Sequence, residues 1–370
     1  MKKLILLIIS LLLLPVLNNA WAQGVDVSEN QLKWHRGSIL EIISEKPASP
    51  LEGTGLTETI QILKVRVNSG QYRGEVFEVE NHLTGQPIFD IQVKRGDRVL
   101  LLIDEENGKV ENIYLADLER DRSIYLLAAL LVLAVVFFAG ATGLRSLIGL
   151  ILTVFLLVGV FLPLTAAGHK PLNLTLLIVG ISSLATFLLV GGLKRKALAG
   201  MLGTWGGIGF SYLLVMYFGR SAYLRGLVEE EAQMLQMTEG FAAFDFQGLI
   251  FSAILIGALG AVMDVAMSVA SAISEIKTAN PAISRNDLIK AGFNMGRDII
   301  GTMTNTLVLA YIGGALPIML LFMVYNPPYI KMINLELIST ELIRALIGSL
   351  GLIFTAPITT IIASVLESRR

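Results

Sequence analysis

The sequence contains no cysteine in its 370 residues. Without a thiol the chain cannot form disulfides, thiolate metal sites or iron–sulfur clusters, and it has no cysteine for lipid attachment near the N-terminus. Long basic runs are also missing, and the formal net charge is −1. These absences argue against a nucleic-acid surface, and they require any domain in water to fold by packing alone.

Charged residues are scarce, at 16% of the chain, whereas hydrophobic residues make up 54%. An ordinary soluble domain has about 25% charged residues, so the bilayer is the expected solvent for most of this chain. The charges are unevenly distributed, because residues 23–122 carry them at the density of a soluble protein and the chain beyond Ser123 carries them in short clusters. We therefore expect a domain in water, residues 23–122, and a membrane domain, residues 123–370.

The first 22 residues have the three parts of a secretory signal peptide. Met1-Lys2-Lys3 is a short positive region, Leu4 to Leu14 is apolar, and Ala20-Trp21-Ala22 is the small-x-small pattern of a cleavage site. An uncleaved anchor helix is the alternative, but Pro15 breaks the apolar run, which is shorter than the ~20 residues that a span needs. We predict cleavage before Gln23.

Short alternating runs separated by glycine or asparagine turns predict an all-β domain in residues 23–122. The expected strands are Ile60–Val67, Val76–Glu80, Phe89–Val93, Val99–Ile103 and Val110–Leu115, with tight turns at 68–70, 95–97 and 106–108. Five or six such strands suit a small barrel or a sandwich, and an oligonucleotide-binding-type barrel is one candidate. The two histidines of this domain, His35 and His82, are expected at the surface.

Seven apolar stretches in residues 123–370 are long enough to cross a bilayer as helices. They are Ile124–Gly143, Leu147–Ala166, Leu172–Leu193, Leu198–Phe218, Leu249–Ile273, Ile299–Val324 and Leu342–Leu366. If the β domain is outside, the cytoplasmic segments hold ten Lys or Arg residues and the opposite loops five, as the positive-inside rule requires. The sequence thus predicts a multi-pass protein of the bacterial cytoplasmic membrane, with residues 23–122 extracytoplasmic and the C-terminus cytoplasmic.

Asp264 is the carboxylate that lies deepest inside a predicted span. A charge there costs about 2.5 to 3.5 kcal/mol on insertion scales, so it needs a partner or a proton. Helical rise places it about 13 Å from the cytoplasmic surface, and Thr302, Asn305 and Thr306 of the next span at about 8 to 14 Å. We predict a polar cluster of these four residues that binds a proton or cation. The alternative is a structural hydrogen bond from a protonated Asp264 to Asn305, which serves assembly only.

The loop before the sixth span predicts further interfacial features. Ser284 is placed to cap a short helix that Gly292 would end. Asn294, Arg297 and Asp298 then stand where the sixth span begins at the headgroup level, where an ion pair or a phosphate contact is inexpensive and a plain solvated turn is the alternative.

Small residues spaced four apart recur in three of the predicted spans. The stripes are Ala199/Gly203/Gly207/Ser211, Ala253/Gly257/Ala261 and Gly351/Thr355/Thr359/Ala363. Such stripes let helices approach closely in lipid, where apolar surfaces alone give no reason to associate. We expect these helices to pack tightly, although a glycine-rich membrane protein also produces such spacings by chance.

The membrane segment resembles the YibE/F-like family of bacterial membrane proteins. The resemblance is carried by the run from Gly257 to Ser268, by the run Asn294 to Leu307, and by Gly348-Ser349-Leu350-Gly351. It implies a multi-pass envelope protein, often called a permease, and it names no substrate. Asp264 and the segment Arg297 to Thr306 fall within these motifs.

Two functions fit these observations. The first is an ion-coupled secondary transporter that uses Asp264, and the second is an envelope assembly or sensing scaffold whose extracytoplasmic domain binds a partner or a second copy. An enzyme is disfavoured, because a lone carboxylate lacks a catalytic partner and no phosphate loop, zinc motif or nucleophile elbow occurs. The expected partners are the lipid bilayer and an ion or small solute, without a cofactor.

Overall fold

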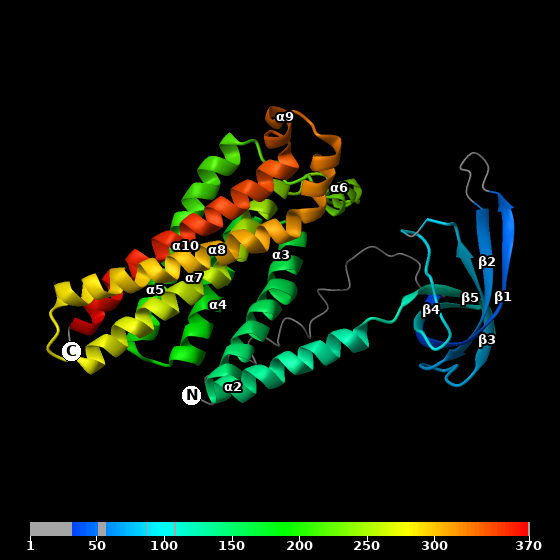
Figure 1. Ribbon diagram of the computed structural model, residues 1–370, viewed down its shortest axis with the longest axis horizontal. Helices are drawn as coiled ribbons and strands as arrows, with labels where there is room; N and C mark the ends of the chain where they lie inside the picture. Colours follow the sequence, from blue (N-terminus) through cyan, green and yellow to red (C-terminus); the bar gives the residue numbers. More distant parts are fainter. Residues whose placement is uncertain (1–31, 51–56, 87, 107–108, 369–370) are drawn as a thin grey trace. The chain divides into compact units, whose positions relative to one another are not determined.

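The computed structural model describes residues 32–50, 57–86, 88–106 and 109–368 (Figure 1). The predicted signal peptide, residues 1–22, lies outside them. Contacts divide the described residues into two compact units, one ending at Ala134 and the other beginning at Val135. The first unit contains the β strands, and the second contains most of the helices.

The β unit is one antiparallel sheet of five described strands in the order β3-β2-β1-β4-β5. The strands are β1 (Leu32–Pro50), β2 (Thr57–Val67), β3 (Val76–Leu83), β4 (Arg98–Glu106) and β5 (Lys109–Leu118). The edge strands β3 and β5 also contact each other, so the sheet curls into a nearly closed barrel. Register shifts after Ile39 and Ile42 mark irregularities in the 19-residue β1, and such bulges allow a strand to bend around a barrel.

Alternation places the apolar residues inside this barrel. Leu63, Val65 and Val67 of β2 are fully buried, as are Val99, Leu101 and Ile103 of β4, whereas the residues between them are more exposed. Four of the five predicted strands are thereby confirmed as β2, β3, β4 and β5. The predicted turn glycines Gly70 and Gly96 have φ of 74° and 94°, and the turn at 107–108 lies outside the described residues.

Two predictions for the β domain are wrong, and one strand was not predicted. The segment Phe89–Val93 is not a strand, because Asp90 Oδ1 accepts hydrogen bonds from the Thr84 amide and hydroxyl and so holds a local turn. The long strand β1 was not expected, since polar residues interrupt its pattern. His35 is buried rather than at the surface; its ring packs edge-on against Tyr72, and its Nδ1 lies 3.0 Å from the Ser69 carbonyl oxygen.

The helical part begins within the first unit and continues through the second. Its long helices are α2 (Asp121–Leu156), α4 (Pro171–Gly191), α5 (Arg195–Leu214), α7 (Phe246–Ala279), α8 (Arg285–Tyr325) and α10 (Glu336–Ser368). The shorter elements are the π-helical turns η1 (Leu157–Phe161) and η2 (Val215–Gly219) and the α-helices α3 (Leu162–Ala166), α6 (Glu230–Met237) and α9 (Tyr329–Ile333). By length and hydropathy, six helical stretches of the described chain are candidate membrane spans.

The first of these stretches, Asp121–Ala166, covers two of the seven predicted spans. Gly140 interrupts it with φ 55° and ψ −137°, a conformation outside the helical region, and α2 is kinked there (Figure 1). Glycine tolerates this backbone because it has no Cβ. The chain is therefore a protein of several long apolar helices, of which the first is divided by a kink.

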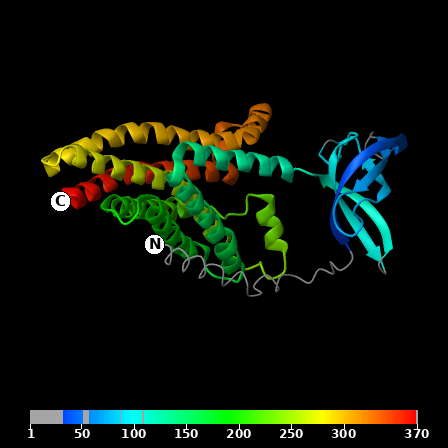
Figure 2. The ribbon, with the colours of Figure 1, turned by 90° about the horizontal axis from the view of Figure 1, so that it is seen from below.

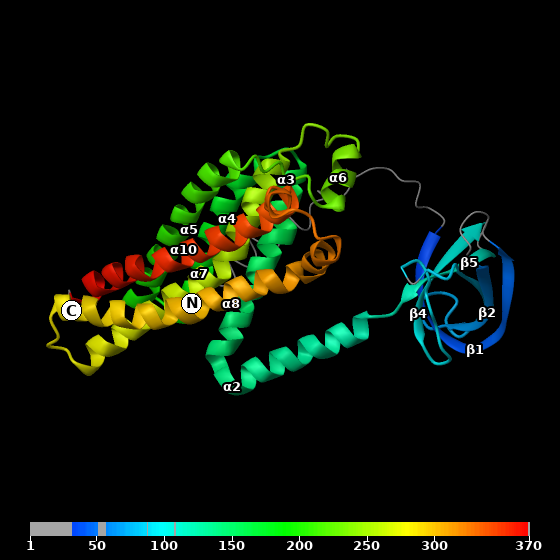
Figure 3. The same ribbon diagram turned by 45° about the horizontal axis from the view of Figure 1, so that its top comes forward.

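Helices α5 and α10 pack through two of the predicted small-residue stripes and lie side by side in Figure 3. A Cβ added to Gly203 would overlap Thr359, one added to Gly207 would overlap Thr355, and one added to Gly351 would overlap Ser211. The prediction of tight packing is confirmed for these two helices.

Helix α8 is one continuous helix of 41 residues, which corrects the prediction of a short helix that ends at Gly292. The predicted cap is present, since the Asp287 amide donates to Ser284 Oγ at 3.2 Å. Gly292 does not end the helix. A Cβ there would lie 2.7 Å from Thr360 Cγ2 and 2.9 Å from Ile273 Cδ1, so this glycine lets α8 pack closely against α10 and α7. Figure 2 shows α8 running along one side of α10.

Candidate functional site

Helix α7 buries a broad apolar face and exposes a narrow stripe of small residues. The exposed positions are Ala253, Gly257, Gly260, Asp264 and Ser268. Spacings of three and four residues keep them on one side of the helix. The side chain of Asp264 forms no hydrogen bond or ion pair with any described residue. A lone carboxylate therefore stands on an otherwise apolar or small-residue face.

Two close approaches establish how α8 is aligned with α7. A Cβ on Gly257 would lie 2.9 Å from the hydroxyl of Tyr311, and a Cβ on Gly292 would lie 2.9 Å from Ile273 Cδ1. The helices are antiparallel, so each step toward the C-terminus of α7 corresponds to a step toward the N-terminus of α8. This alignment places the α8 segment 301–304 at the level of Asp264.

Of the predicted partners of Asp264, Thr302 lies within the 301–304 segment, Asn305 and Thr306 lie beyond it, and none of the three bonds to the carboxylate. Thr302 Oγ1 donates to the Asp298 carbonyl at 3.2 Å and to the Ile299 carbonyl at 3.1 Å, and Thr306 Oγ1 donates to the Thr302 carbonyl at 3.0 Å. Both hydroxyls are thus satisfied by their own helix. The side chain of Asn305 is exposed and has no partner among the described residues. The structure does not bring the predicted cluster together, since Thr302, Asn305 and Thr306 are exposed while Met303 and Leu307 of the same helix pack against the core.

Thr304 is a neighbour that the sequence pattern did not indicate. It lies seven residues before Tyr311, and therefore on the same face of α8. Its hydroxyl is buried and has no hydrogen-bond partner among the described residues. Its burial identifies it, and the sequence does not show which threonine of this helix is buried.

The three predicted interfacial residues lie along the outer side of α8. Asn294, Arg297 and Asp298 are all exposed, and the charged pair forms no ion pair with a described residue. They occupy consecutive turns of a continuous helix rather than the start of a new one. Their predicted contact with a headgroup remains a prediction.

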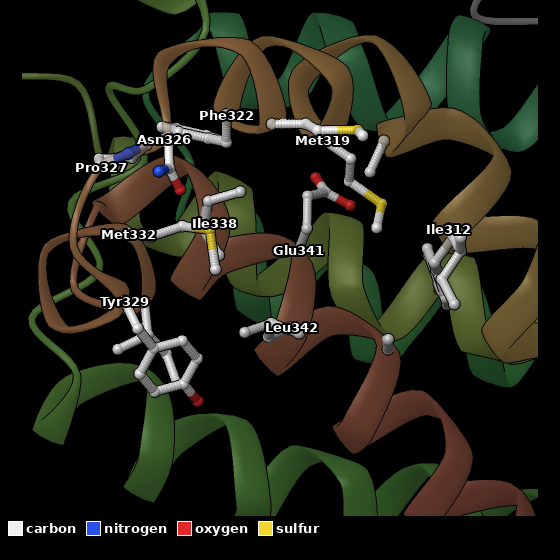
Figure 4. Close-up of a pocket in the computed structure, with 15 residues that line it drawn as sticks. Ile312, Met319, Phe322, Asn326, Pro327, Tyr329, Met332, Ile338, Glu341 and Leu342 are labelled. Atoms are coloured by element: carbon white, nitrogen blue, oxygen red, sulfur yellow. The ribbon is translucent and has the colours of Figure 1, made fainter.

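A cavity of about 740 Å³ lies between α8, α9 and α10, at the far end of α8 from its Ser284 cap (Figure 4). Its lining is mostly apolar. The α8 side contributes Tyr311, Ile312, Ala315, Met319, Phe322 and Met323, and α10 contributes Ile338, Glu341, Leu342 and Ala345. This volume is within the range of small-molecule sites, which are typically apolar with a few polar groups.

One charged residue, Glu341, lines the cavity, and its carboxylate is paired with Arg344, which lies outside the lining. Arg344 Nη1 donates to Glu341 Oε1 at 2.8 Å, and the two side chains are 19% and 27% exposed. Figure 4 shows the Glu341 carboxylate rising from α10 toward Met319. Arg344 Nε and the Tyr311 hydroxyl are buried without a partner among the described residues. Of these two residues, Tyr311 lines the cavity and Arg344 does not.

Tyr311 connects the cavity to the face of α7 that carries Asp264. Its hydroxyl approaches Gly257 on α7, and its ring lines the cavity. Gly257 and Asp264 are seven residues apart, which is about 10.5 Å along the helix. Sequence reasoning missed this arrangement, because Glu341 and Arg344 stand at the edge of a predicted span, where charges are ordinary.

A multidentate metal site is not present in the part of the chain that the structure describes, since no group of three or more His, Asp or Glu side chains gathers there. A cation bound at Asp264 would need its remaining ligands from backbone oxygens, hydroxyls or water. Such a set suits a proton or a hard, weakly held cation better than a transition metal.

Comparison with known families supports the resemblance noted in the motifs. The model described as YibE/F-like protein matches residues 127–369, and the model described as YibE/F family N-terminal domain matches residues 38–118. The first match includes Asp264, Tyr311 and Glu341, and the second includes most of the β barrel. No curated protein and no solved structure matches the chain significantly.

Proposed function

The chain belongs to the YibE/F-like family, and from that premise we propose that it is a membrane permease in which Asp264 carries the coupling proton or cation. The proposal combines the carboxylate on α7 with the cavity between α8 and α10. Asp264 is the ion site, and the cavity is the site of the solute.

The observation that carries this proposal is the unpaired carboxylate of Asp264 within a 34-residue apolar helix. A charge inside the bilayer costs about 2.5 to 3.5 kcal/mol unless it is neutralised. A proton or a bound cation removes most of that cost, and its release restores the charge. The carboxylate can therefore alternate between two states whose energies in lipid differ.

The cavity supports the same function from the other end of α8. It combines an apolar lining with the Glu341 carboxylate, and Tyr311 both lines it and approaches Gly257 of α7. An ion at Asp264 would act on the cavity through the α7–α8 contact at Gly257 and Tyr311. In the orientation that the basic residues favour, the cavity faces the extracytoplasmic side and the C-terminus is cytoplasmic.

The test is proton flux through the full chain reconstituted in liposomes that contain a pH-sensitive dye. A pH gradient is imposed while sodium, potassium, magnesium and a panel of small solutes are added outside in turn. Asp264→Asn keeps the size of the side chain but cannot ionise, and we expect it to reduce coupled flux by at least about tenfold. Glu275→Gln, which removes an exposed carboxylate of the same helix α7, is the matched control and should retain it.

Flux that is equal in wild type and Asp264→Asn, with both proteins monodisperse in detergent, would contradict the proposal. It would instead assign the carboxylate to helix assembly, where an interhelical hydrogen bond contributes about 0.6 kcal/mol on average.

A further inference from the structure

The outer face of the β barrel gathers arginines that are far apart in the sequence. Ser38 of β1 is paired directly with Arg66 of β2 on one side and with Arg98 of β4 on the other. Paired residues point to the same face of a sheet, and so do residues two apart on one strand, which adds Arg36. Arg73, from the turn between β2 and β3, completes the group.

These four arginines line one cavity of about 720 Å³, which lies entirely within the β unit. Two of them have carboxylate partners, since Arg36 pairs with Asp121 and Arg98 lies 3.6 Å from Glu119. Arg66 and Arg73 form no ion pair with any described residue. Four guanidinium groups against two carboxylates leave a surplus of two positive charges around the cavity.

The cavity lies beside the point where the chain enters its first candidate membrane span. Asp121, the partner of Arg36, is the first residue of α2. On the same outer face, Trp34 and Tyr114 both stand opposite Leu102 in the sheet, and they are 65% and 51% exposed. Tryptophan and tyrosine are enriched at the level of the lipid headgroups. The arginines and the start of α2 therefore lie together, and the aromatic pair lies on the same outer face, four residues along β1 from Ser38.

We propose that this arginine cavity binds the phosphate group of an anionic phospholipid and thereby tethers the β barrel to the membrane surface. Guanidinium groups bind phosphate with two parallel hydrogen bonds, which a lysine cannot reproduce. Arg66 and Arg73 supply the guanidinium groups that have no carboxylate partner. Trp34 lies at the boundary of the acyl region. This site is independent of Asp264 and of transport.

The experiment titrates the detergent-solubilised full chain with dihexanoyl phosphatidylglycerol, dihexanoyl phosphatidylcholine or inorganic phosphate, and measures binding by calorimetry. The test variant is Arg66→Ser with Arg73→Ser. The control variant is Lys46→Ser with Lys64→Ser, which removes the same charge away from the cavity; Lys64 stands opposite Glu41 and Glu78 in the sheet.

We expect wild type and the lysine control to bind phosphatidylglycerol equally and the arginine variant to bind it at least about tenfold more weakly, since hydrogen bonds to charged groups are the strong ones. Phosphatidylcholine should bind weakly, because its headgroup carries no net charge. Inorganic phosphate should also bind more weakly than phosphatidylglycerol, since it has no acyl chains to meet Trp34.

Three results would overturn the proposal. If the arginine variant and wild type bind phosphatidylglycerol with equal affinity, the cavity is not the binding site. If wild type binds the two lipids equally, the site does not select for charge. If wild type binds inorganic phosphate as tightly as phosphatidylglycerol, the cavity is a site for a free anion. If the serine variant does not fold, Arg66→Lys with Arg73→Lys is the test variant, because it keeps the positive charges and removes the two guanidinium groups. An unchanged affinity in that variant also contradicts the proposal.

Discussion

Helices α5 and α7 carry the same sequence pattern and use it in opposite ways. In α5, Gly203 and Gly207 face threonines of α10 so closely that no Cβ would fit. In α7, Gly260 has open space where its Cβ would be, and the neighbouring Asp264 is exposed. A stripe of small residues thus serves packing in α5, whereas in α7 it leaves the Asp264 carboxylate accessible.

The difference shows what gives such a stripe its role. The facing stripe on α10 contains Thr355 and Thr359, whose hydroxyls bond to their own backbone at 2.7 and 2.8 Å. They add bulk to the interface without an unpaired polar group. The α7 stripe contains a carboxylate that no described residue pairs. A packing role explains the first stripe, whereas the second requires a proton, an ion or a partner.

The largest effect on stability is expected at the α5–α10 interface. Gly207→Ala would place a methyl group against Thr355 and 3.1 Å from the Gly351 carbonyl oxygen. Overpacking typically costs 1 to 3 kcal/mol, and we expect a loss of about 2 to 3 kcal/mol in the free energy of unfolding, measured by chemical denaturation in detergent. The control is Gly209→Ala, also in α5, where nothing lies within 4 Å of the added Cβ. A similar loss in both variants would show that helix flexibility, not the interface, determines stability.

A smaller effect is expected where α8 meets α7 and α10. Gly292→Ala places its Cβ 2.7 Å from a Thr360 methyl and 2.9 Å from the end of Ile273. Flexible side-chain ends can move aside, so we expect a loss of about 1 to 2 kcal/mol. Gly301→Ala on the same helix meets nothing within 4 Å and is the control. If Gly292→Ala were as stable as this control, α8 would be free to move away from its neighbours.

The smallest effect on stability is expected on the α7 stripe itself. Gly260→Ala should leave the free energy of unfolding unchanged or raise it by up to about 1 kcal/mol, because alanine favours the helix and nothing crowds its Cβ. The same denaturation assay measures it. A loss like that of Gly207→Ala would break the comparison, since it would mean that a second copy of the chain covers the α7 stripe in the detergent-solubilised protein.

The β barrel was only partly predictable from sequence. Alternating apolar residues identified β2 to β5, because one side of each strand faces the core. The same reasoning missed β1, in which His35 is buried despite its polar ring. It also predicted Phe89–Val93 as a strand, because periodicity does not show the hydrogen bonds that Thr84 donates to the Asp90 carboxylate. Local patterns report burial, and they do not report which long-range partner satisfies a polar group.

The candidate sites were predictable to different degrees. Asp264 stands out in any hydropathy plot, because a charge in an apolar run is costly wherever the helix packs. Its level relative to Thr302 and Asn305 followed from helical rise alone. The hydroxyls of Thr302 and Thr306, however, donate to the backbone of their own helix α8. The contact of Tyr311 with Gly257 depends on how α7 and α8 cross.

The sequence by itself determined the division into a β domain and apolar helices, the cap at Ser284 and the presence of a carboxylate, Asp264, inside an apolar run. These follow from composition, periodicity and the cost of charge in lipid, all of which act along the chain. The tertiary structure decided which small-residue stripe is buried, that Glu341 and Tyr311 line the same cavity, and that four arginines spread from Arg36 to Arg98 meet on one face. The physical reason is register: strand pairing and helix crossing bring distant residues together, and no local pattern encodes the offset between two elements.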